Sequence, residues 1–252
     1  MSFILDKVKL YNDDCFNVFP KINDKSINLF LLDLPFGTTS LKWDSLIDLD
    51  KMWVEIKRMM KSNAIICFFC TTKFGYSIIK SNEKWFKYDL IWEKSRKVGF
   101  LSANKRQLRK HENIYVFKKE QGIYNPQKTP RDKDYKHSGK RSSEEHYGNV
   151  LECKKEYKKE DGKHPTSIIE NTILEYNNPQ KPIHRTEKPI GLLEYLIKTY
   201  TEENDLVMDF TMGSGSCGEA CLNTKRNFIG VELDKEIYEL AKNRIDKVLT
   251  KL

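Results

Sequence analysis

The segment 205–232 constrains the fold of this 252-residue chain more than any other part of the sequence. It reads as a strand ending at Asp209, a Gly-x-Gly-x-x-Gly turn, a helix, a second strand and an acid, Glu232. Gly213 and Gly215 allow a ligand to approach the backbone, and the helix that follows offers free N–H groups. The spacing from Asp209 to Glu232 is close to the roughly 20 residues at which an acid holds ribose hydroxyls. This order predicts an α/β nucleotide site rather than a glycine turn that only packs two elements.

A second short run, Asp33-Leu34-Pro35-Phe36, follows an apolar stretch at 27–32 that predicts a strand buried on both faces. A carboxylate at the end of such a strand lies at the edge where open α/β sheets bind ligands. Pro35 fixes the backbone, and the Phe36 ring can stack on a planar group whose amine donates to Asp33. An equally simple interpretation is a turn with a capping Asp and a core Phe, because four-residue motifs recur by chance.

The composition predicts a folded domain with a substantial core. With 252 residues and 39% hydrophobic content, the chain can form one large α/β domain or a domain with a smaller insert. No apolar run approaches a membrane span, and the N-terminus lacks the layout of a signal peptide. Cys67 and Cys70 form a C-x-x-C inside a predicted strand, and no second pair has zinc spacing, so core cysteines are favoured and no metal is expected. We expect a cytoplasmic, reducing environment.

The positive charge is concentrated in one stretch. The chain has a net charge of +8, which permits a polyanionic partner. Between residues 94 and 110 there is no Asp or Glu, and the basic residues are Lys94, Arg96, Lys97, Lys105, Arg106, Arg109 and Lys110. Such a loop suits contacts with phosphates and bases, although most charge runs are only a solvated surface.

The apolar periodicity predicts the remaining elements and one unusual segment. It favours helices at 46–60, 74–81, 189–200 and 234–249, and strands at 64–70, 88–92 and 113–117, after a short strand or turn and a linker within 1–26. From about 119 to 180 the periodicity nearly vanishes. That stretch is too long for an ordinary connection, and it is therefore either disordered or an inserted module with a task of its own.

Taken together, these motifs resemble the amino-methylating DNA methyltransferases of the β arrangement. In that family an Asp-Pro-Pro-Tyr-like catalytic motif comes first, a target-recognition segment next, and the S-adenosylmethionine motifs last. The matching stretches are Asp33-Leu34-Pro35-Phe36, His184-Arg185-Thr186-Glu187-Lys188-Pro189, Asp209-Phe210-Thr211-Met212-Gly213-Ser214-Gly215-Ser216 and Gly230-Val231-Glu232. The stretch from His111 to Phe117 also looks like the family's lead into its recognition segment. Four separate motifs in the right order make the resemblance specific.

The matching stretches depart from the family pattern at several positions. Leu34 replaces the first proline of the catalytic motif, but the family uses the backbone carbonyl of that residue. Phe36 replaces Tyr and keeps the stacking face. In the stretch from His184 to Pro189, Arg185 and Glu187 replace Pro and Gln, which leaves Thr186 and Lys188 as the better-supported contacts.

The resemblance implies a Rossmann-like methyltransferase sheet, mostly parallel with one antiparallel strand, in circularly permuted motif order. Residues 1–118 would form the catalytic half of the domain, and 181–252 its S-adenosylmethionine-binding half. Residues 119–180 would be an inserted target-recognition segment.

The resemblance also implies roles for individual residues. Asp33 and the carbonyl of Leu34 would accept hydrogen bonds from the exocyclic amine of a flipped base, with Pro35 in the same turn and Phe36 stacked on the base. The cofactor would be held by Asp209, Gly213, Gly215, Glu232, Thr186 and Lys188 and, on a weaker match, by Asp14 and Cys15. The side chains expected on DNA are Lys94, Arg96, Lys97, Lys105, Arg106 and Arg109.

The implied reaction is direct, site-specific methyl transfer to adenine N6 in double-stranded DNA. An Asp at the position of Asp33 favours adenine, whereas cytosine-N4 enzymes of the family more often carry Ser there. The alternatives are a cytosine-N4 DNA methyltransferase, an enzyme that methylates RNA or protein amides, and a catalytically idle nucleic-acid-binding module. Dimers are common in the family, and a cognate restriction endonuclease is a further partner that the resemblance allows.

Overall fold

The computed structural model describes residues 7–35, 46–137, 155–170 and 187–251. The chain divides into two compact units, one of residues 1–125 and 167–252 and the other of residues 126–166. The predicted insert at 119–180 encloses the second unit; its assignment to target recognition stays a prediction. Within the described residues, no helix is both long and apolar enough to cross a membrane.

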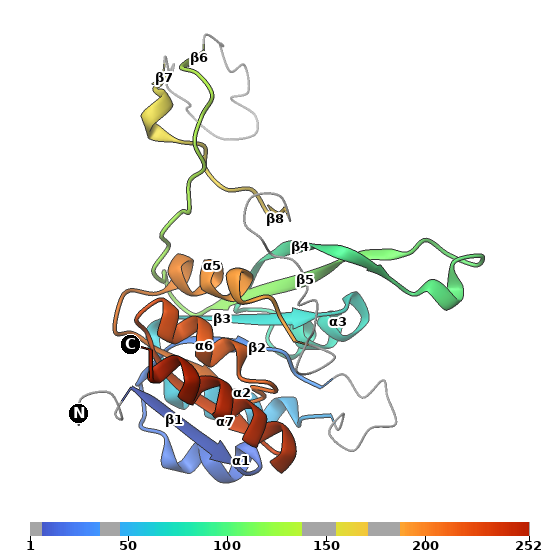
Figure 1. Cartoon of the computed structure of the whole chain (residues 1–252), viewed down its shortest axis with the longest axis vertical. Helices are drawn as coiled ribbons and strands as arrows, with labels where there is room; N and C mark the ends of the chain where they lie inside the picture. Colours follow the sequence, from blue (N-terminus) through green and yellow to red (C-terminus); the bar gives the residue numbers. More distant parts are fainter. Residues whose placement is uncertain (1–6, 36–45, 138–154, 171–186, 252) are drawn as a thin grey trace. The chain divides into compact units, whose positions relative to one another are not determined.

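An eight-stranded sheet forms the centre of the first unit (Figure 1). Its order is β1-β10-β9-β2-β3-β5-β4-β8, with bounds β1 Val8–Asn12, β2 Ile27–Leu32, β3 Met60–Cys70, β4 Phe86–Val98, β5 Arg109–Lys118, β8 Ile168–Ile169, β9 Leu206–Asp209 and β10 Asn227–Glu232. All neighbours pair in parallel except β5, which is antiparallel to both β3 and β4. The predicted sheet with one antiparallel strand is confirmed.

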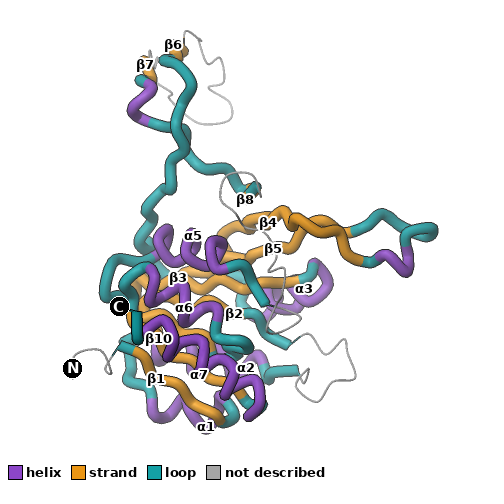
Figure 2. The backbone as a smooth tube through the Cα atoms, viewed as in Figure 1, coloured by secondary structure: helices purple, strands orange, loops and turns teal. Residues whose placement is uncertain are grey.

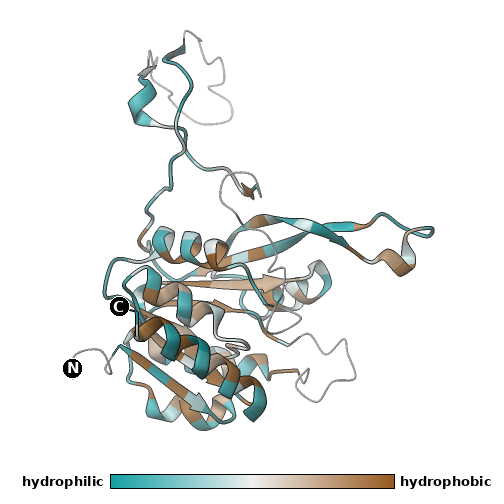
Figure 3. Ribbon diagram, in the orientation of Figure 1, coloured by the Kyte–Doolittle hydropathy of each residue, from teal (hydrophilic) through white to brown (hydrophobic). Residues whose placement is uncertain are grey.

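Helices cover both faces of this sheet, as the buried central strands require. One core holds α5 Ile190–Tyr200, α6 Ser216–Asn223 and α7 Lys235–Leu249 against residues such as Leu29 and Leu31 of β2. The opposite core holds α1 Cys15–Val18, η1 Phe19–Lys21, α2 Leu49–Met59 and α3 Thr72–Ser81 against Phe30 and Leu32. Alternate residues of β2 thus face opposite cores, which explains its uninterrupted apolar sequence. Figure 3 shows the same apolar colouring along the central strands.

The predicted helix at 46–60 is shorter than its apolar repeat. It begins at Leu49 because the Asp48 carboxylate caps it, accepting a hydrogen bond from the N–H of Lys51 at 3.1 Å. Leu46 precedes this cap and is exposed, while Met60 already belongs to β3. The periodicity therefore predicted the helix correctly but extended it beyond its cap.

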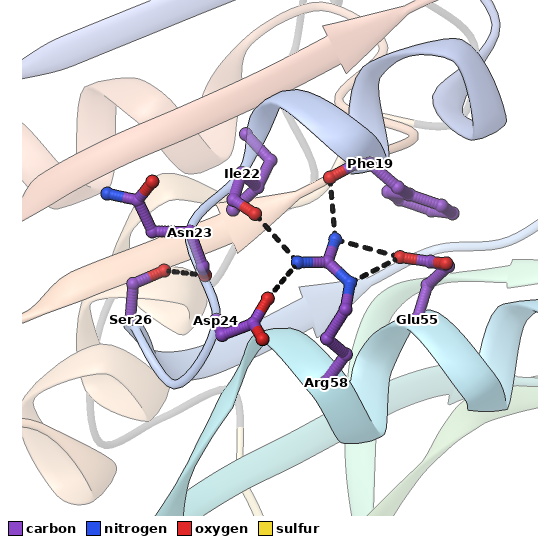
Figure 4. Close-up of polar contacts among 7 residues, drawn as sticks. All are labelled: Phe19, Ile22, Asn23, Asp24, Ser26, Glu55 and Arg58. Carbon is purple, nitrogen blue, oxygen red and sulfur yellow. Dashed lines mark hydrogen bonds and ion pairs between the residues drawn. The ribbon is translucent and has the colours of Figure 1, made fainter.

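A single arginine ties the first helices of the chain to α2 (Figure 4). The Arg58 guanidinium donates to the carbonyls of Phe19 at 2.7 Å and Ile22 at 2.9 Å, and to the carboxylates of Asp24 at 2.5 Å and Glu55 at 2.9 Å. Its planar fork can serve several acceptors in fixed directions. The connection between α1 and β2 is therefore held by side-chain hydrogen bonds as well as by apolar packing.

Strands β4 and β5 form a long hairpin arm, which we define as residues 93–112. The pairing of β5 with β3 ends at Asn113, whereas its pairing with β4 continues to Arg109. Figure 2 shows the strands running along most of the arm, with the short helical turn η2 Phe100–Ser102 near its end. The stretch predicted as a basic loop is thus largely a two-stranded hairpin. It lacks apolar alternation because no other strand of the sheet pairs with it.

The second unit contains little regular structure among its described residues. It holds the short antiparallel pair β6 Tyr135–His137 and β7 Lys155–Tyr157, followed by the turn η3 Lys159–Asp161. A bridge between Thr129 and Lys163 brings its two ends together. The described residues of this unit therefore pair with one another, and the choice between a disordered stretch and an inserted module with its own task stays a prediction.

Candidate active site

Three acidic residues lie at the carboxyl ends of adjacent parallel strands. Asp33 follows β2, Asp209 ends β9 and Glu232 ends β10. Since β2 pairs with β9 and β9 with β10, these strand ends meet at one edge of the sheet. That edge is where open α/β sheets bind ligands. The fold thus brings the ends of the predicted catalytic and cofactor motifs, which lie far apart in the sequence, to one edge of the sheet.

The glycine turn between β9 and α6 leaves open space beside Glu232. Gly213 and Gly215 both have positive φ, 51° and 77°, a region that favours glycine. A Cβ on Gly213 would meet nothing within 4 Å, whereas a Cβ on Gly215 would lie 3.0 Å from Ala241 of α7. Gly213 therefore keeps the turn accessible, while Gly215 permits close packing of α7.

Glu232 is fixed by two backbone donors. Its Oε2 accepts from the N–H of Gly213 at 3.0 Å and its Oε1 from the N–H of Asp234 at 2.9 Å. Burial raises the pKa of this carboxyl, and these hydrogen bonds oppose the shift. Each oxygen retains a second lone pair. A carboxylate beside an open glycine turn is suited to accept from the hydroxyls of a ribose.

Thr211 connects the two halves of the site. Its N–H donates to Oδ1 of Asp209 at 3.1 Å, and its hydroxyl lies 3.3 Å from the carbonyl of Asp33 and 3.4 Å from the same Asp209 oxygen. Burial raises the pKa of Asp209 to about 8, with Asp33 and Glu232 adding to the shift and the N–H of Thr211 opposing it. Nothing in the sequence reasoning assigned a role to Thr211, although it stands inside the matched motif.

Asp33 belongs to a chain of four alternating charges. Lys188 Nζ lies 2.5 Å from Asp33 Oδ2 and 3.3 Å from Glu112 Oε1, and the other oxygen of Glu112 pairs with Lys94. The Asp33 side chain keeps 24% of its surface exposed, whereas those of Lys188, Glu112 and Lys94 are nearly buried. Lys188 also lies 5.0 Å from the centre of the Phe69 ring. Lys188, which was expected to contact the cofactor, is therefore paired with Asp33, the carboxylate predicted to be catalytic.

The pKa values of Asp33 and Glu112 are shifted in opposite directions. For Asp33, burial outweighs the attraction of Lys188, and Glu112 adds repulsion, so its pKa is raised. Burial also disfavours the charge of Glu112, but two lysines surround it and its pKa is lowered. Lys188 lies between both carboxylates, which raise its pKa against the effect of burial. Asp33 is consequently the more basic of the two carboxylates.

Glu112 lies in the stretch from His111 to Phe117 that resembles the family, but no role was predicted for it. The alternation of side chains along β5 could have indicated one. Glu112, Ile114 and Val116 point to the same face of the strand, and the two apolar residues lie in the core beneath α5. An acid that continues a buried apolar row needs a partner. Lys188, immediately before α5, faces the same core and provides one.

Asp14 and Cys15 lie next to the cofactor edge of the sheet. The preceding strand β1 pairs with β10, with Asn12 opposite Glu232. Asp14 caps α1 by accepting from the N–H of Phe16 at 2.8 Å, and burial raises the pKa of the partly exposed Cys15 to about 12. Their contact with a cofactor stays a prediction.

Several expected residues are placed differently, or lie outside the described parts. Leu34 is buried and Pro35 is half-buried directly after β2, while Phe36 and Thr186 fall outside the described residues. The two cysteines of the C-x-x-C motif are free and buried in β3. Within the described parts of the chain, no group of three or more His, Cys, Asp or Glu side chains is arranged to hold a metal ion.

The basic residues of the arm fall into two groups. Lys94 is paired with Glu112 and lies 4.9 Å from the Trp92 ring centre, and Lys110 pairs with Glu93 at 2.6 Å. The remaining five are exposed, and within the described residues none forms an ion pair: Arg96, Lys97, Lys105, Arg106 and Arg109. The phosphate contact expected of Lys94 stays a prediction, although its ammonium is mostly buried and paired with Glu112. The two compensating acids lie just outside the run of basic residues.

Comparison with known proteins gives a consistent match. The family model described as DNA methylase (N6_N4_Mtase) matches residues 27–243. The chain is 24% identical over 251 residues to the Type II methyltransferase M.HpaI of Haemophilus parainfluenzae, covering 94% of this chain and 74% of that protein. It is 26% identical over 258 residues to the Type II methyltransferase M.BglII of Bacillus subtilis, covering 92% and 67%.

Solved structures share the fold over nearly the whole chain. The M1.HpyAVI–SAM complex aligns with a TM-score of 0.62 at 23% identity, covering 94% of this chain and 99% of that one. The PvuII DNA methyltransferase, described as cytosine-N4-specific, aligns with a TM-score of 0.63 at 14% identity, covering 97% and 92%.

Proposed function

This chain belongs to the N6/N4 DNA methylase family, and we propose that it transfers a methyl group from S-adenosylmethionine to N6 of adenine in double-stranded DNA. The observation that carries the proposal is the position of Asp33 at the same sheet edge as Glu232 and Gly213. Thr211 links the two halves through the backbone of Asp33. A base amine and a methyl donor bound at this edge would lie next to each other.

The cofactor half offers a donor and acceptor set that fits S-adenosylmethionine. Glu232 would accept from the ribose hydroxyls, and the open turn at Gly213 would face the rest of the molecule. Asp209, a buried acid at the end of β9, would hold an amine-bearing group. Gly215, Thr186, Asp14 and Cys15 complete the proposed contacts. When bound, the cofactor supplies an electrophilic methyl group on its sulfonium.

The catalytic half would orient the base and stabilise the charge that develops on it. A flipped base would donate from its exocyclic amine to Asp33 and to the carbonyl of Leu34, while Phe36 stacks on its ring. The amine nitrogen forms the new bond to carbon as the carbon–sulfur bond breaks. Orientation lowers the barrier, and the Asp33 carboxylate stabilises the positive charge on nitrogen before it loses a proton. No protein nucleophile is required.

The choice of adenine rests on Asp33. The resemblance associates an Asp at this position with adenine N6 and a Ser with cytosine N4. Cytosine N4 is the second candidate, because a cytosine-N4-specific enzyme shares this fold.

We assign the DNA contacts to the arm and to the second unit. The five cations of the arm that are exposed, and that form no ion pair with the part of the chain that the structure describes, would bind phosphates. Residues 126–166 would contribute to target recognition. A homodimer and a cognate restriction endonuclease stay predictions.

Incubation with tritiated S-adenosylmethionine and unmethylated duplex DNA, followed by nucleoside analysis, tests this function. We expect label in N6-methyladenine, and no label with the Asp33→Ala variant, which should still bind DNA. Label in N4-methylcytosine would refute the assignment of the base. Label only in RNA offered in parallel would refute the DNA substrate.

A further inference from the structure

Resting on the proposed function, we propose that Lys188 and Glu112 are positioning residues for methyl transfer. Lys188 keeps Asp33 ionised and holds one of its oxygens, and Glu112 fixes Lys188 in that position. The other oxygen of Asp33 is then left to accept from the base amine. This role differs from the cofactor contact that the sequence motif suggested for Lys188.

The two carboxylate oxygens of Asp33 have different surroundings. Lys188 approaches Oδ2 at 2.5 Å, and no described residue donates a hydrogen bond to Oδ1. The exposed 24% of the Asp33 side chain gives a ligand access to this carboxylate. A carboxylate held on one side in this way cannot rotate freely, so its second oxygen keeps a fixed direction.

Glu112 supplies what a lone lysine would lack. Lys188 lies 3.3 Å from Glu112 Oε1, and Lys94 holds Oε2 of the same carboxylate. The four paired side chains, two lysines and two acids, carry a net charge of zero together, which lowers the free-energy cost of burying them. The rings of Phe69 and Trp92 lie over the ammonium groups of Lys188 and Lys94, at 5.0 and 4.9 Å, and attract their positive charge. Lys188 is thus anchored at a point from which it can serve Asp33.

Among the described residues, the titratable groups around Asp33 come from five segments of the chain. They are Lys188 before α5, Glu112 on β5, Lys94 on β4, Cys70 at the end of β3, and Asp209 at the end of β9. Of these, only the two lysines favour the ionised form. Loss of Lys188 would leave Asp33 partly desolvated and beside Glu112, and both effects favour its protonated form.

The test is the pH dependence of kcat, with DNA and cofactor saturating, for Lys188→Gln and for the double variant Lys188→Gln/Glu112→Gln. Removal of an opposite charge at contact distance shifts an acid by about 1 to 3 pH units. We expect the apparent pKa of the acid limb of the kcat profile to rise by that amount in Lys188→Gln. The activity lost near neutral pH should then return at alkaline pH. The double variant should move the limb back down, because the repelling acid is gone.

Two further variants separate positioning from structure. Lys188→Arg keeps the charge and should restore the wild-type limb. Lys242→Gln removes a lysine that pairs with Asp246 on the exposed surface of α7, and it should leave the profile unchanged. A uniform loss of activity at every pH in Lys188→Gln, without recovery in the double variant, would overturn the proposal. So would weaker S-adenosylmethionine binding with an unmoved acid limb.

A readout without catalysis keeps the two proposals apart. In protein labelled with ¹³C at aspartate carboxyls, the Asp33 signal is identified by its loss in Asp33→Asn. Its titration should shift upward in Lys188→Gln and back in the double variant. Absence of methyl transfer by the wild type would refute the proposed function, whereas an unmoved Asp33 titration would refute this inference.

Discussion

The arm makes a quantitative prediction about how DNA affinity depends on salt. Arg109 and Lys110 are neighbours in the sequence, yet Arg109 is exposed and unpaired within the described residues, whereas Lys110 pairs with Glu93 at 2.6 Å. A free cation can displace a condensed counterion from DNA, and a cation already neutralised by an acid cannot do so without breaking its pair. Arg109→Gln and Lys110→Gln therefore form a matched pair of variants.

The magnitude follows from counting the free cations. Each phosphate that a protein neutralises contributes about −0.9 to the slope of log K against log salt. If all five free cations of the arm contact phosphates, the arm contributes a slope of about −4.5. Arg109→Gln should reduce the steepness by about 0.9, and Arg106→Gln/Arg109→Gln by about 1.8. Between 50 and 200 mM salt, the double variant would then lose roughly 12-fold less affinity than the wild type.

Fluorescence anisotropy with a labelled duplex, titrated at four or more salt concentrations, measures these slopes directly. Lys110→Gln should keep the wild-type slope, even where the freed Glu93 weakens binding at every salt concentration. Equal slopes for Arg109→Gln and the wild type would refute the assignment of the arm to phosphates. A change of about 0.9 in Lys110→Gln would refute the role of its ion pair.

Three further predictions concern stability and can be measured by denaturant unfolding. Gly215→Ala should destabilise the protein by about 1–3 kcal/mol, because it adds backbone strain and places a Cβ 3.0 Å from Ala241 of α7. Gly99→Ala, which is also at positive φ but has open space around its Cβ, should lose less stability. Arg58→Met should cost about 2–3 kcal/mol, since two backbone carbonyls and two carboxylates lose a charged donor that is 28% exposed; a loss below about 0.5 kcal/mol would contradict that role. Asp209 has a pKa of about 8 in the fold, against an ordinary value of 3.8, so the folded state binds more protons between these pH values and its stability falls as the pH rises. Asp209→Asn should therefore be more stable than the wild type at pH 7. An equal or lower stability at that pH would contradict the shift.

The sequence predicted those parts of the fold in which local pattern and tertiary structure agree. Strand β2 is apolar because helices cover both of its faces, and the glycine turn is recognisable because only glycine tolerates its backbone and its contact with α7. The motif order then placed Asp33 and Glu232 at one edge of the sheet. These inferences needed no knowledge of distant pairing.

The features that escaped prediction depend on contacts between residues that lie far apart in the sequence. Lys94 was expected on DNA because no acid lies near it within the run of basic residues. Its partner Glu112 lies beyond the other end of that run, and the pairing of β4 with β5 brings the two side chains together. Lys188 was expected on the cofactor because the stretch from His184 to Pro189 matches one of the family's motifs. Its contact with Asp33 joins residues from opposite ends of the chain. A single sequence carries no signal for either meeting.

The anchoring of the chain on both sides of residues 126–166 bears on how such a protein could acquire a new target sequence. On one side, the N–H of Asn125 donates to the carbonyl of Thr199 at 2.8 Å; on the other, the carbonyl of Ser167 accepts from Ile91 at 2.8 Å, and β8 extends the sheet. Changes between these two attachment points leave the pairing of the sheet intact. Resting on the proposed role of residues 126–166 in target recognition, we expect this segment to vary in length and sequence between relatives. Chimeras joined at Asn125 and Ser167 should keep the catalytic sheet while their specificity changes.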